Sequence, residues 1–439
     1  MAGIFKAYDI RGIYGSELTE AIAYRIGRAF ATLYTPSSVA VGRDMRPHSQ
    51  PLFEALAKGL NEHGANVIDL GLCSTPMTYF GIGTLKTDAG IMVTASHNPG
   101  QYNGMKPCRA NAVPISGATG IAEIEKLVLS GHFAAPAAVP GKILAHPIAE
   151  GYAAFIRRYA HLRRPLKVAM DMANGMGIVE ARALDGLFTM DKLFDTLDGT
   201  FPNHEANPLV EETYDSLRAH VKAGQYDFGV AFDGDADRAG FVDEKGEIIS
   251  MDIITALIAR DVLAQEKGVI FYDLRSSWAV REVIAEQGGT PMMSRVGHAF
   301  IKQQMRDTQA LFAGELSGHY YFRDNFYTES SALAVLRVAN IVSAAGCPLS
   351  ELIKPIKRYF ASGEINSEVH DTAAVLARIN GDYRDGRRTD LDGISVEYPD
   401  WWFNVRLSNT EPLVRLNVEA KTAHLMQTKR DELLAKIRG

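Results

Sequence analysis

Three aspartates stand at alternate positions in the segment FDGDADR, residues 232–238. The apolar run YDFGVAF leads into this segment and AGFVDEKGEII follows it, so we expect a loop between two strands. Gly234 permits a tight turn that lets Asp233, Asp235 and Asp237 converge on one hard cation. Without a cation, three clustered carboxylates would repel one another. The pattern therefore predicts a magnesium site, and the alternative is an acidic hairpin tip.

Two other chemistries that use similar acidic loops do not match the residues present. An EF-hand would place Glu244 at its twelfth position, but Arg238 stands where the EF-hand needs glycine and Phe241 offers no ligand. A phosphatase with an aspartyl nucleophile would carry threonine or valine in place of Asp237. Magnesium binding remains the interpretation of this loop.

A serine and a histidine, Ser96 and His97, follow the apolar run AGIMV in TASHNPGQYNGMK, residues 94–106. The nucleophile elbow of a hydrolase requires GxSxG, and Ala95 and Asn98 do not match it. Adjacent side chains on an extended chain point to opposite sides, so we expect His97 to be a poor base for Ser96. The pattern argues against a hydrolase.

We interpret Ser96 as a phosphoryl carrier. Phosphoserine brings about two negative charges and three acceptor oxygens, and one of these oxygens can bind the magnesium ion of the aspartate loop. Arg238 and Lys106 can then balance charge as the phosphoryl group moves. The alternative is a purely structural transition from a strand to a turn that Asn-Pro closes.

A third segment, GELSGH at residues 314–319, has the residue types that bind a sugar. The carboxylate of Glu315 can accept hydrogen bonds from two neighbouring sugar hydroxyls, and Ser317 can donate or accept one more. His319 can carry a proton near neutral pH. An ordinary turn would have much the same composition.

A fourth segment, RLSNTEP at residues 406–412, is suited to phosphate. The side chains of Ser408, Asn409 and Thr410, with the amides of a tight turn, form a neutral cradle for phosphate oxygens. Arg406 adds a planar, bidentate donor. A polar hairpin turn is the alternative.

Positive charge gathers in small groups near such segments. Each group has Gly, Ser, Asn or Thr as neighbours in turn-like sequence, and the groups are Arg43 with Arg46, Lys106 with Arg109, Arg295 with His298 and Lys302, and Arg406 with Arg415. This grouping predicts contacts with a ligand that carries phosphate.

The overall composition gives no sign of nucleic-acid or membrane binding. The 439 residues carry a formal net charge of −6, and 46% of them are hydrophobic. Nonspecific binding to nucleic acid or membranes needs a basic surface, so we expect neither partner. The N-terminus, MAGIFKAYDIRG, lacks the pattern of a secretory signal, which makes the cytoplasm the expected location. Nothing in the sequence fixes the oligomeric state.

The elements that must position these residues follow an α/β pattern. Helical patterns alternate with short runs rich in Val, Ile and Phe, which indicates mainly parallel sheets. Three such runs end at an aspartate, Asp44, Asp171 and Asp273, which indicates three similar α/β domains. A smaller α+β domain follows them. The expected domains are residues 1–142, 143–247, 248–360 and 361–439.

Together the four segments resemble the α-D-phosphohexomutase superfamily, in its phosphomannomutase/phosphoglucomutase branch. TASHNP, DGDADR, GELSGH and RLSNTEP occur in the order found in that family, one in each expected domain. FKAYDIRG and VGHAFIK extend the resemblance over essentially the whole chain. The resemblance implies four domains around a central cleft, a hexose phosphate substrate, and a hexose 1,6-bisphosphate that is both intermediate and activator.

The resemblance also implies roles for individual residues. Ser96 matches the phosphoserine, and the magnesium ligands are its phosphate with Asp233, Asp235 and Asp237. The residues that balance charge or transfer protons are Arg11, His97, Lys106, Arg238 and His319. The substrate-binding residues are Glu315, Ser317, Arg406, Ser408, Asn409 and Thr410, with Tyr8, Arg275 and His298 nearby.

The resemblance bears on the sugar as well. GELSGH and DGDADR favour mannose or glucose phosphates, whereas the glucosamine branch usually has Gln after Gly-Glu and carries DGDGDR, which Leu316 and Ala236 do not match. A loop that reads hydroxyls 3 and 4 does not sense carbon 2, so activity on both mannose and glucose is expected. Arg275 departs from the lysine that relatives often carry, and the two differ in phosphate geometry. The alternatives are a phosphoglucosamine mutase and a noncatalytic protein that binds phosphosugars.

Overall fold

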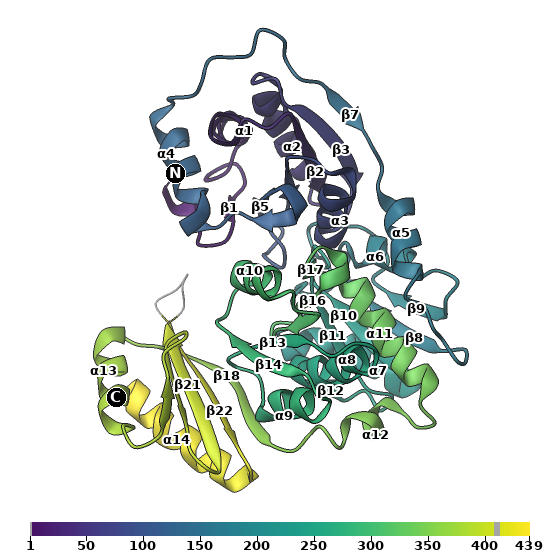
Figure 1. Cartoon of the computed structure of the whole chain (residues 1–439), viewed down its shortest axis with the longest axis vertical. Coiled ribbons are helices and arrows are strands. Elements are labelled where there is room, and N and C mark those ends of the chain that lie inside the picture. Colours follow the sequence, from purple (N-terminus) through teal and green to yellow (C-terminus); the bar gives the residue numbers. More distant parts are fainter. Residues whose placement is uncertain (1, 408–412) are drawn as a thin grey trace.

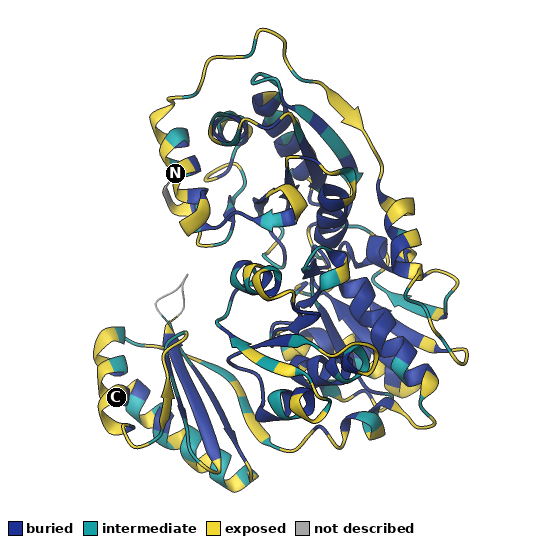
Figure 2. Cartoon of the chain, viewed as in Figure 1, coloured by how far each residue is buried: buried dark blue, intermediate teal, exposed yellow. Residues whose placement is uncertain are grey.

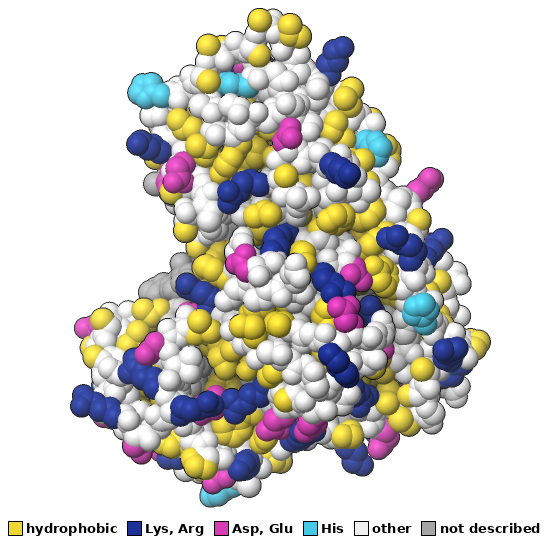
Figure 3. Space-filling view, in the orientation of Figure 1, with side chains coloured by type: hydrophobic (Ala, Val, Ile, Leu, Met, Phe, Trp, Pro, Cys, Tyr) yellow, Lys and Arg dark blue, Asp and Glu magenta, His cyan; other side chains and the backbone are white. Residues whose placement is uncertain are grey.

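The computed structural model describes residues 2–407 and 413–439. Figure 1 shows an upper lobe built on the first sheet, a central block that holds the second and third sheets, and a lower lobe built on the fourth. The molecule is hollowed on the side where the upper and lower lobes face each other (Figure 3). No helix within the described residues is long and apolar enough to cross a membrane.

The first sheet is mixed and has the strand order β1-β5-β4-β2-β3-β7, with β6 paired to β5. Strands β4, β2, β3 and β7 are parallel, and β5 is antiparallel to both β4 and β1. The strands are β1 (Ile10–Ile13), β2 (Ser38–Arg43), β3 (Asn66–Leu72), β4 (Ala89–Val93), β5 (Tyr102–Arg109), β6 (Val113–Pro114) and β7 (Ile143–Ala145). The helices are α1 (Glu20–Tyr34), α2 (Ser49–Asn61), α3 (Thr75–Leu85) and α4 (Ile121–Ser130).

The second sheet has the order β12-β11-β10-β8-β9, with β10, β8 and β9 parallel and β11 antiparallel to its neighbours. Its strands are β8 (Lys167–Asp171), β9 (Thr189–Leu193), β10 (Phe228–Phe232), β11 (Ala239–Val242) and β12 (Ile248–Ile249). The helices of this part are α5 (Ala149–Arg157), α6 (Gly177–Arg182) and α7 (Asp215–Ala223).

The third sheet has the order β14-β13-β15-β16-β17, with β14, β13 and β15 parallel and the last two strands antiparallel. Its strands are β13 (Val269–Asp273), β14 (Thr290–Ser294), β15 (Phe312–Gly314), β16 (Tyr320–Phe322) and β17 (Thr328–Glu329). The helices are α8 (Met251–Gln265), α9 (Trp278–Glu286), α10 (His298–Thr308), α11 (Ser331–Ala344) and α12 (Leu349–Ile353).

The fourth sheet is antiparallel throughout, in the order β18-β22-β21-β20-β19. Its strands are β18 (Phe360–Glu368), β19 (Arg387–Thr389), β20 (Ile394–Glu397), β21 (Trp401–Leu407) and β22 (Leu413–Ala420). Helices α13 (Thr372–Asp382) and α14 (Ala423–Arg438) complete this lobe. The expected fold class, three similar α/β units and a smaller C-terminal α+β unit, is confirmed.

The three mixed sheets share one local plan. Each has a central parallel strand (β2, β8 or β13) that is followed, at its carboxyl end, by the same turn. There a backbone N–H donates to an aspartate two residues earlier: Arg46 to Asp44 at 3.1 Å, Ala173 to Asp171 at 2.9 Å, and Arg275 to Asp273 at 2.8 Å. The recurring aspartates thus fold the turns after the strands.

The second and third sheets share one core. Helices α8 and α11 are buried along most of their length, and Figure 2 shows both as dark blue. Their sequences are apolar around the whole circumference, which suits helices that are covered on all sides. The fourth sheet has a separate core, whereas the first sheet has one core of its own and, through α3, a share in the core of the central block. The central block is therefore a rigid base for the loops that its strands carry.

A buried carboxyl group joins the first lobe to the central block. Glu180 in α6 accepts hydrogen bonds from the Ser74 hydroxyl, which caps α3, from the Tyr152 hydroxyl at 3.0 Å, and from the backbone N–H of Ala332 in α11 at 3.3 Å. Burial raises the pKa of Glu180 to about 7. This contact brings together the N-terminal ends of α3 and α11.

Candidate active site

Three of the four predicted segments occupy equivalent places in the three mixed sheets. Each lies between a parallel strand and the antiparallel strand that follows it: β4 and β5, β10 and β11, and β15 and β16. Each also contains a turn that a backbone hydrogen bond closes, from Asn98 to Ala95 at 3.1 Å, from Ala236 to Asp233 at 3.2 Å, and from Gly318 to Glu315 at 3.0 Å. Because the plan repeats, the three loops meet at one place.

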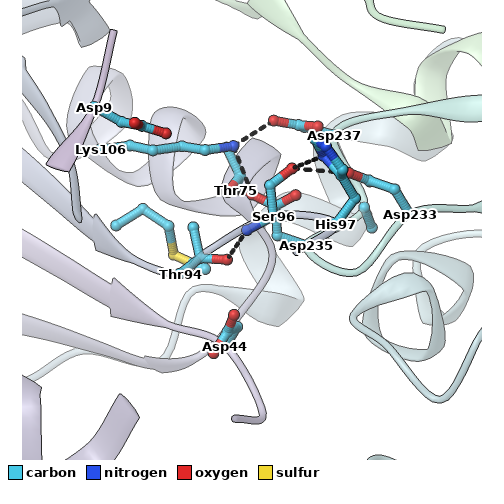
Figure 4. Close-up of polar contacts among 12 residues, drawn as sticks. Asp9, Asp44, Thr75, Thr94, Ser96, His97, Lys106, Asp233, Asp235 and Asp237 are labelled. Atoms are coloured by element: carbon cyan, nitrogen blue, oxygen red, sulfur yellow. Dashed lines mark hydrogen bonds and ion pairs between the residues drawn. The ribbon is translucent and has the colours of Figure 1, made fainter. Parts of the chain in front are cut away.

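Ser96 lies at the contact between the first two loops. Its side chain is buried, and its hydroxyl oxygen donates to Asp233 Oδ2 at 3.0 Å (Figure 4). Its φ of 52° lies in the left-handed region, which turns the chain away from the extended form. His97 Nδ1 consequently lies 3.3 Å from Ser96 Oγ, so the prediction that the two side chains diverge was wrong. Burial, with Arg238 and Arg11 nearby, holds the pKa of His97 well below its usual range.

Gly234 brings the aspartate loop against the serine loop. A Cβ atom at this position would lie 2.3 Å from the carbonyl oxygen of Ser96, which no side chain could tolerate. The sequence analysis explained Gly234 by a tight turn, and the close approach of the two backbones is a second reason for a glycine at this position.

Arg46 holds the serine loop from behind. Its guanidinium donates to the carbonyl oxygens of Ser96 at 2.9 Å, Asn98 at 2.6 Å, Pro99 at 2.8 Å and Tyr102 at 3.0 Å, and it pairs with the Asp44 carboxylate. Arg46 was grouped with residues expected to face a phosphate ligand. It is only 2% exposed and binds the protein's own carbonyl groups, so that expectation was wrong for this residue.

Lys302 departs from its expected role for a similar reason. Its ammonium is fully buried, pairs with Glu329 at 2.7 Å and lies 3.9 Å from the centre of the Tyr79 ring. A lysine that is neutralised and covered in this way stabilises the contact between β17 and α10 and does not face a ligand.

The three aspartates form a compact, buried cluster. Side-chain oxygens of Asp233, Asp235 and Asp237 lie within 4.8 Å of one another. Lys106 Nζ contacts Asp235 at 2.7 Å and Asp237 at 2.6 Å, and the Thr75 hydroxyl donates to Asp235 at 2.5 Å. Among the residues described, Asp235 Oδ1 is buried without a hydrogen-bond partner. These donors suit a hard divalent cation.

Electrostatics supports the same conclusion. Burial, together with Asp237 and Asp235, raises the pKa of Asp233 well above its ordinary value. Burial acts in the same direction on Asp237, but Lys106 and His319 outweigh it and hold that pKa well below the usual range. Burial alone would lower the pKa of Lys106, and the two carboxylates raise it instead. The raised pKa of Asp233 reflects the repulsion among the three carboxylates, which a bound cation would relieve.

His319 connects the sugar loop to the aspartates. Its Nε2 lies 3.2 Å from Asp237 Oδ1, and its Nδ1 lies 3.2 Å from Glu315 and 2.9 Å from the Ser317 hydroxyl. Burial alone would lower its pKa, but Asp237 and Glu315 raise it to about 9. The Arg238 side chain reaches His319 at 3.3 Å, and the backbones of the two residues form a β-bridge. His319 therefore carries a positive charge at neutral pH.

Glu315 has partners on both carboxylate oxygens. Tyr321 donates its hydroxyl to Oε2 at 2.5 Å, and the backbone N–H of Gly297 donates to Oε1 at 3.2 Å. Burial would raise the pKa of Glu315, yet His319 and its other donors lower it to about 2. Next to Gly297, the rings of His298 and Tyr8 meet edge to face at 5.8 Å between centroids.

Arg11 lies at the edge of the site. One of its guanidinium nitrogens donates to Asn98 Oδ1 at 2.5 Å and another pairs with Asp9. It therefore contacts the serine loop without touching Ser96 or the aspartates.

The predicted phosphate segment lies mainly outside the described residues, because Ser408, Asn409 and Thr410 fall in 408–412. Arg406 is described, and it lies with Arg415 and Arg275, which the sequence analysis named, around Glu364, which it did not name. Glu364 Oε2 accepts from Arg406 at 2.6 Å and from Arg275 at 3.5 Å, and its Oε1 accepts from Arg415 at 3.1 Å. We call Arg275, Arg406, Arg415 and Glu364 the arginine cluster.

Most of the predicted residues belong to one network. Hydrogen bonds and ion pairs link Ser96, His97, Lys106, Asp233, Asp235, Asp237, Arg238, Glu315, Ser317 and His319 without a gap. The arginine cluster joins it indirectly, because Asp273 Oδ2 accepts both from Arg275 at 2.6 Å and from the backbone N–H of Leu316 at 2.8 Å. The sequence analysis missed Thr75 and Glu364 in this region, and it misread Arg46.

A chain with three mixed sheets, a fourth antiparallel sheet and this acidic loop beside a buried serine matches known family models along its length. The models described as Phosphoglucomutase/phosphomannomutase match residues 2–135 (alpha/beta/alpha domain I), 150–246 (domain II), 250–359 (domain III) and 364–436 (C-terminal domain). The chain belongs to this family of four-domain phosphohexomutases, which confirms the resemblance noted in its sequence.

Individual relatives agree with this assignment. The chain is 42% identical over 445 residues to a phosphomannomutase of Salmonella montevideo, with 98% of both chains covered. It is 40% identical to a protein of Xanthomonas campestris named phosphohexose mutases, with 99% of both covered. A solved phosphoglucomutase/phosphomannomutase family protein of Burkholderia thailandensis superposes with a TM-score of 0.92 at 33% identity, over 100% of this chain and 97% of that one. The protein is an isomerase of the phosphohexomutase class.

Proposed function

We propose that the protein is a phosphomannomutase that interconverts mannose 1-phosphate and mannose 6-phosphate, with activity on the glucose phosphates as well. The reaction passes through phosphorylated Ser96 and a hexose 1,6-bisphosphate. The observation that carries this proposal is the placement of Ser96 Oγ, 3.0 Å from Asp233 inside a buried network of three carboxylates and Lys106. Relatives at 42% identity that are named phosphomannomutase support mannose.

Magnesium is the cofactor that suits the donors. Asp233, Asp235 and Asp237 would hold it together with an oxygen of the Ser96 phosphate. When bound, the ion stabilises the negative charge of the transferring phosphoryl group. The buried Asp235 Oδ1, which lacks a hydrogen-bond partner among the described residues, supports this assignment.

The protein's own side chains would provide the rest of the charge balance. In one direction of transfer, the bond from Ser96 Oγ to phosphorus breaks and a bond from a substrate oxygen to phosphorus forms. The hydroxyl proton of the substrate is transferred, in net, to Ser96 Oγ. Lys106 and His319 remain cationic near neutral pH because carboxylates raise the pKa of each. They can therefore offset the charge that develops on the phosphoryl oxygens. His97 is neutral, with its lowered pKa, and offers an acceptor beside Ser96 Oγ.

The arginine cluster would bind the phosphate that is not transferred. The sugar loop supports this arrangement because it contacts both centres: Leu316 N–H bonds Asp273, which also holds Arg275, while His319 bonds Asp237. A sugar held by Glu315 and Ser317 could then present either carbon 1 or carbon 6 to Ser96. Such a two-way fit is what a mutase needs, since one serine must serve both ends of the substrate.

Phosphorus NMR of the purified protein tests this function. The sample would contain Mg²⁺, a trace of glucose 1,6-bisphosphate, and the 1-phosphates of mannose, glucose and N-acetylglucosamine in turn. We expect mannose 6-phosphate to accumulate, with glucose 6-phosphate in the parallel sample. Turnover of the amino sugar alone would favour a phosphoglucosamine mutase, and no turnover of any substrate would favour a noncatalytic phosphosugar-binding protein.

A further inference from the structure

Glu364 is surrounded by arginines from three strands or loops. Arg406 in β21 and Arg415 in β22 are directly opposite each other in the strand pairing, an arrangement in which like charges repel. Glu364 in β18 reaches both, at 2.6 and 3.1 Å. The pairing of β18 with β22 shifts between Ala361 and Glu364, and Gly363 has a φ of 69° there. The irregular strand thus positions a carboxylate between two cations.

The third arginine belongs to a different lobe. Arg275 lies in the turn after β13. Its Nη2 donates to Asp273 at 2.6 Å, and its Nη1 lies 3.5 Å from Glu364. Glu364 therefore links the fourth sheet to the third. These arginines lower the pKa of Glu364 against the effect of its burial, so the group is an anion at neutral pH.

The cluster still has unused capacity for an anion. Glu364 shares its two carboxylate oxygens among three guanidinium groups, those of Arg275, Arg406 and Arg415. The Arg406 side chain is only 3% exposed, and its Nε has no hydrogen-bond partner among the described residues. A phosphate group offers more charge and more acceptor oxygens than one carboxylate, so it can compete for these donors.

We propose that Glu364 is a built-in anion that occupies the arginine cluster and competes with the substrate's phosphate for it. This inference rests on the proposed function of the cluster as the site of the phosphate that is not transferred. A mutase must release its bisphosphate intermediate for it to turn around, and the cluster would hold that phosphate more tightly without a resident carboxylate. Competition from the resident carboxylate weakens the hold and speeds release.

A purely organising role for Glu364 predicts the opposite sign. If the carboxylate served only to hold the arginines in position, its neutralisation would disorder them and weaken phosphate binding. If it competes, its neutralisation tightens phosphate binding. The two roles are therefore distinguished by the direction of one measured change.

The test is calorimetric titration of the full-length protein with inorganic phosphate, comparing wild type with Glu364→Gln. We expect the Kd for phosphate to fall about tenfold, because one nearby negative charge is removed and the shape is kept. The tightening should disappear when Arg406→Gln is added, which places the effect at the cluster. Unchanged or weaker phosphate binding by Glu364→Gln would overturn the proposal.

A matched control is Glu397→Gln. Glu397 in β20 pairs with Arg281 of α9 at 2.8 Å, so this variant also removes an ion pair between the third and fourth sheets, but it does so away from the cluster. Its phosphate affinity should equal that of wild type. If Glu364→Gln does not fold, Glu364→Asp retracts the carboxylate by one methylene, and phosphate should bind it more tightly than it binds wild type, by a smaller factor.

Kinetics separate this inference from the proposed function. With mannose 1-phosphate, Glu364→Gln should lower both KM and kcat, because the intermediate leaves the cluster more slowly. If no hexose phosphate is turned over but phosphate still binds the variant more tightly, the proposed function fails and the built-in anion stands. If wild type turns over hexose phosphate normally and phosphate binding is not tightened in the variant, the proposed function stands and the built-in anion is overturned.

Discussion

Two charged centres of this molecule are opposites in composition. We call Ser96, Lys106, Asp233, Asp235 and Asp237 the transfer centre. Its three carboxylates lie close to one ammonium group, that of Lys106, which is 2.7 Å from Asp235 and 2.6 Å from Asp237. In the arginine cluster, three guanidinium groups surround one carboxylate, that of Glu364. Carboxylates predominate in the first centre and guanidinium groups in the second. Each is therefore suited to a ligand of the opposite sign, a divalent cation in one case and a phosphate in the other.

The two centres also differ in how they are built. The aspartates Asp233 and Asp235 are fully buried, and they lie on a loop of the central block. The side chain of Glu364 is 20% exposed, and its partners come from two sheets with separate cores. Ser96 and Lys106 come from the first lobe, and α3 of that lobe packs into the same core as the second and third sheets, so the centre that must hold a reactive group lies at a contact with a shared core. The centre that must bind and release lies where two units with separate cores meet.

Loss of the serine should give the largest effect. Ser96→Ala removes the oxygen that carries the phosphoryl group, so kcat should fall by about a thousandfold or more while the fold is kept. Steady-state assays with mannose 1-phosphate measure the loss, and mass spectrometry should find phosphate on Ser96 of the wild type only. Ser130→Ala, at an exposed helix end, is the control. Near-normal turnover of Ser96→Ala would rule out the phosphoserine route.

Removal of the single ammonium should break the transfer centre as a folded unit. Lys106→Met leaves Asp235 buried without its cation and takes one cation from Asp237, so the free energy of unfolding should drop by about 4 kcal/mol in metal-free buffer. Added Mg²⁺ should restore much of this loss by supplying the missing charge. Scanning calorimetry with and without Mg²⁺ measures the effect. An equal loss in both buffers would contradict the assignment of a cation to this centre.

The charge on His319 should make stability depend on pH. Its folded pKa of about 9 lies above its ordinary value of 6.5, so its imidazolium stabilises the fold fully below pH 6.5. That contribution, up to about 3 kcal/mol, should be lost as pH rises from 6.5 through 9. The thermal midpoints of wild type and His319→Gln, measured across this range, should converge at the alkaline end. Parallel curves would show that the histidine is not charged in the folded state.

The buried carboxyl group of Glu180 lies outside both centres and should also make stability depend on pH. The folded pKa of Glu180, about 7, lies above its ordinary value of 4.5, so the folded state binds the proton more tightly than the unfolded state does. Stability should therefore fall as pH rises from 4.5 to 7, by about 2 kcal/mol. Glu180→Gln keeps a neutral side chain and should remove this slope. Melting curves from pH 4.5 to 8 test it, and an unchanged slope in the variant would exclude Glu180 as its source.

The sequence predicted what depends on local spacing. The alternate aspartates of 232–238 and the strand-to-turn pattern around Ser96 lie within a few residues, so their chemistry could be inferred from residue types alone. The partner of the aspartates, Lys106, lies 129 residues before Asp235, and only the family resemblance and the need for charge balance connected the two.

Other residues could not be predicted because their roles depend on packing between sheets. Glu364 and Thr75 carry no local signal, since their partners are far away in the sequence and include residues of another lobe, Arg275 for Glu364 and Asp235 for Thr75. Arg46 was misread because an arginine among turn residues looks the same whether it faces a ligand or four carbonyl oxygens. Ser408, Asn409 and Thr410 stay a prediction. Their segment lies outside the described residues.

The exposed stretch between α4 and α5 determines what cleavage by a protease would do to the molecule. Residues 131–147 run along the outside of the first lobe and are mostly exposed, and β7 pairs with β3 in that lobe's sheet. Noncovalent contacts such as Thr75 to Asp235 and Ser96 to Asp233 join the lobe to the rest. A protease that cuts this stretch would therefore leave the two fragments associated. The intact peptide link raises the effective concentration of each part near the other. Without it, the noncovalent contacts should still let two separately made polypeptides reassemble.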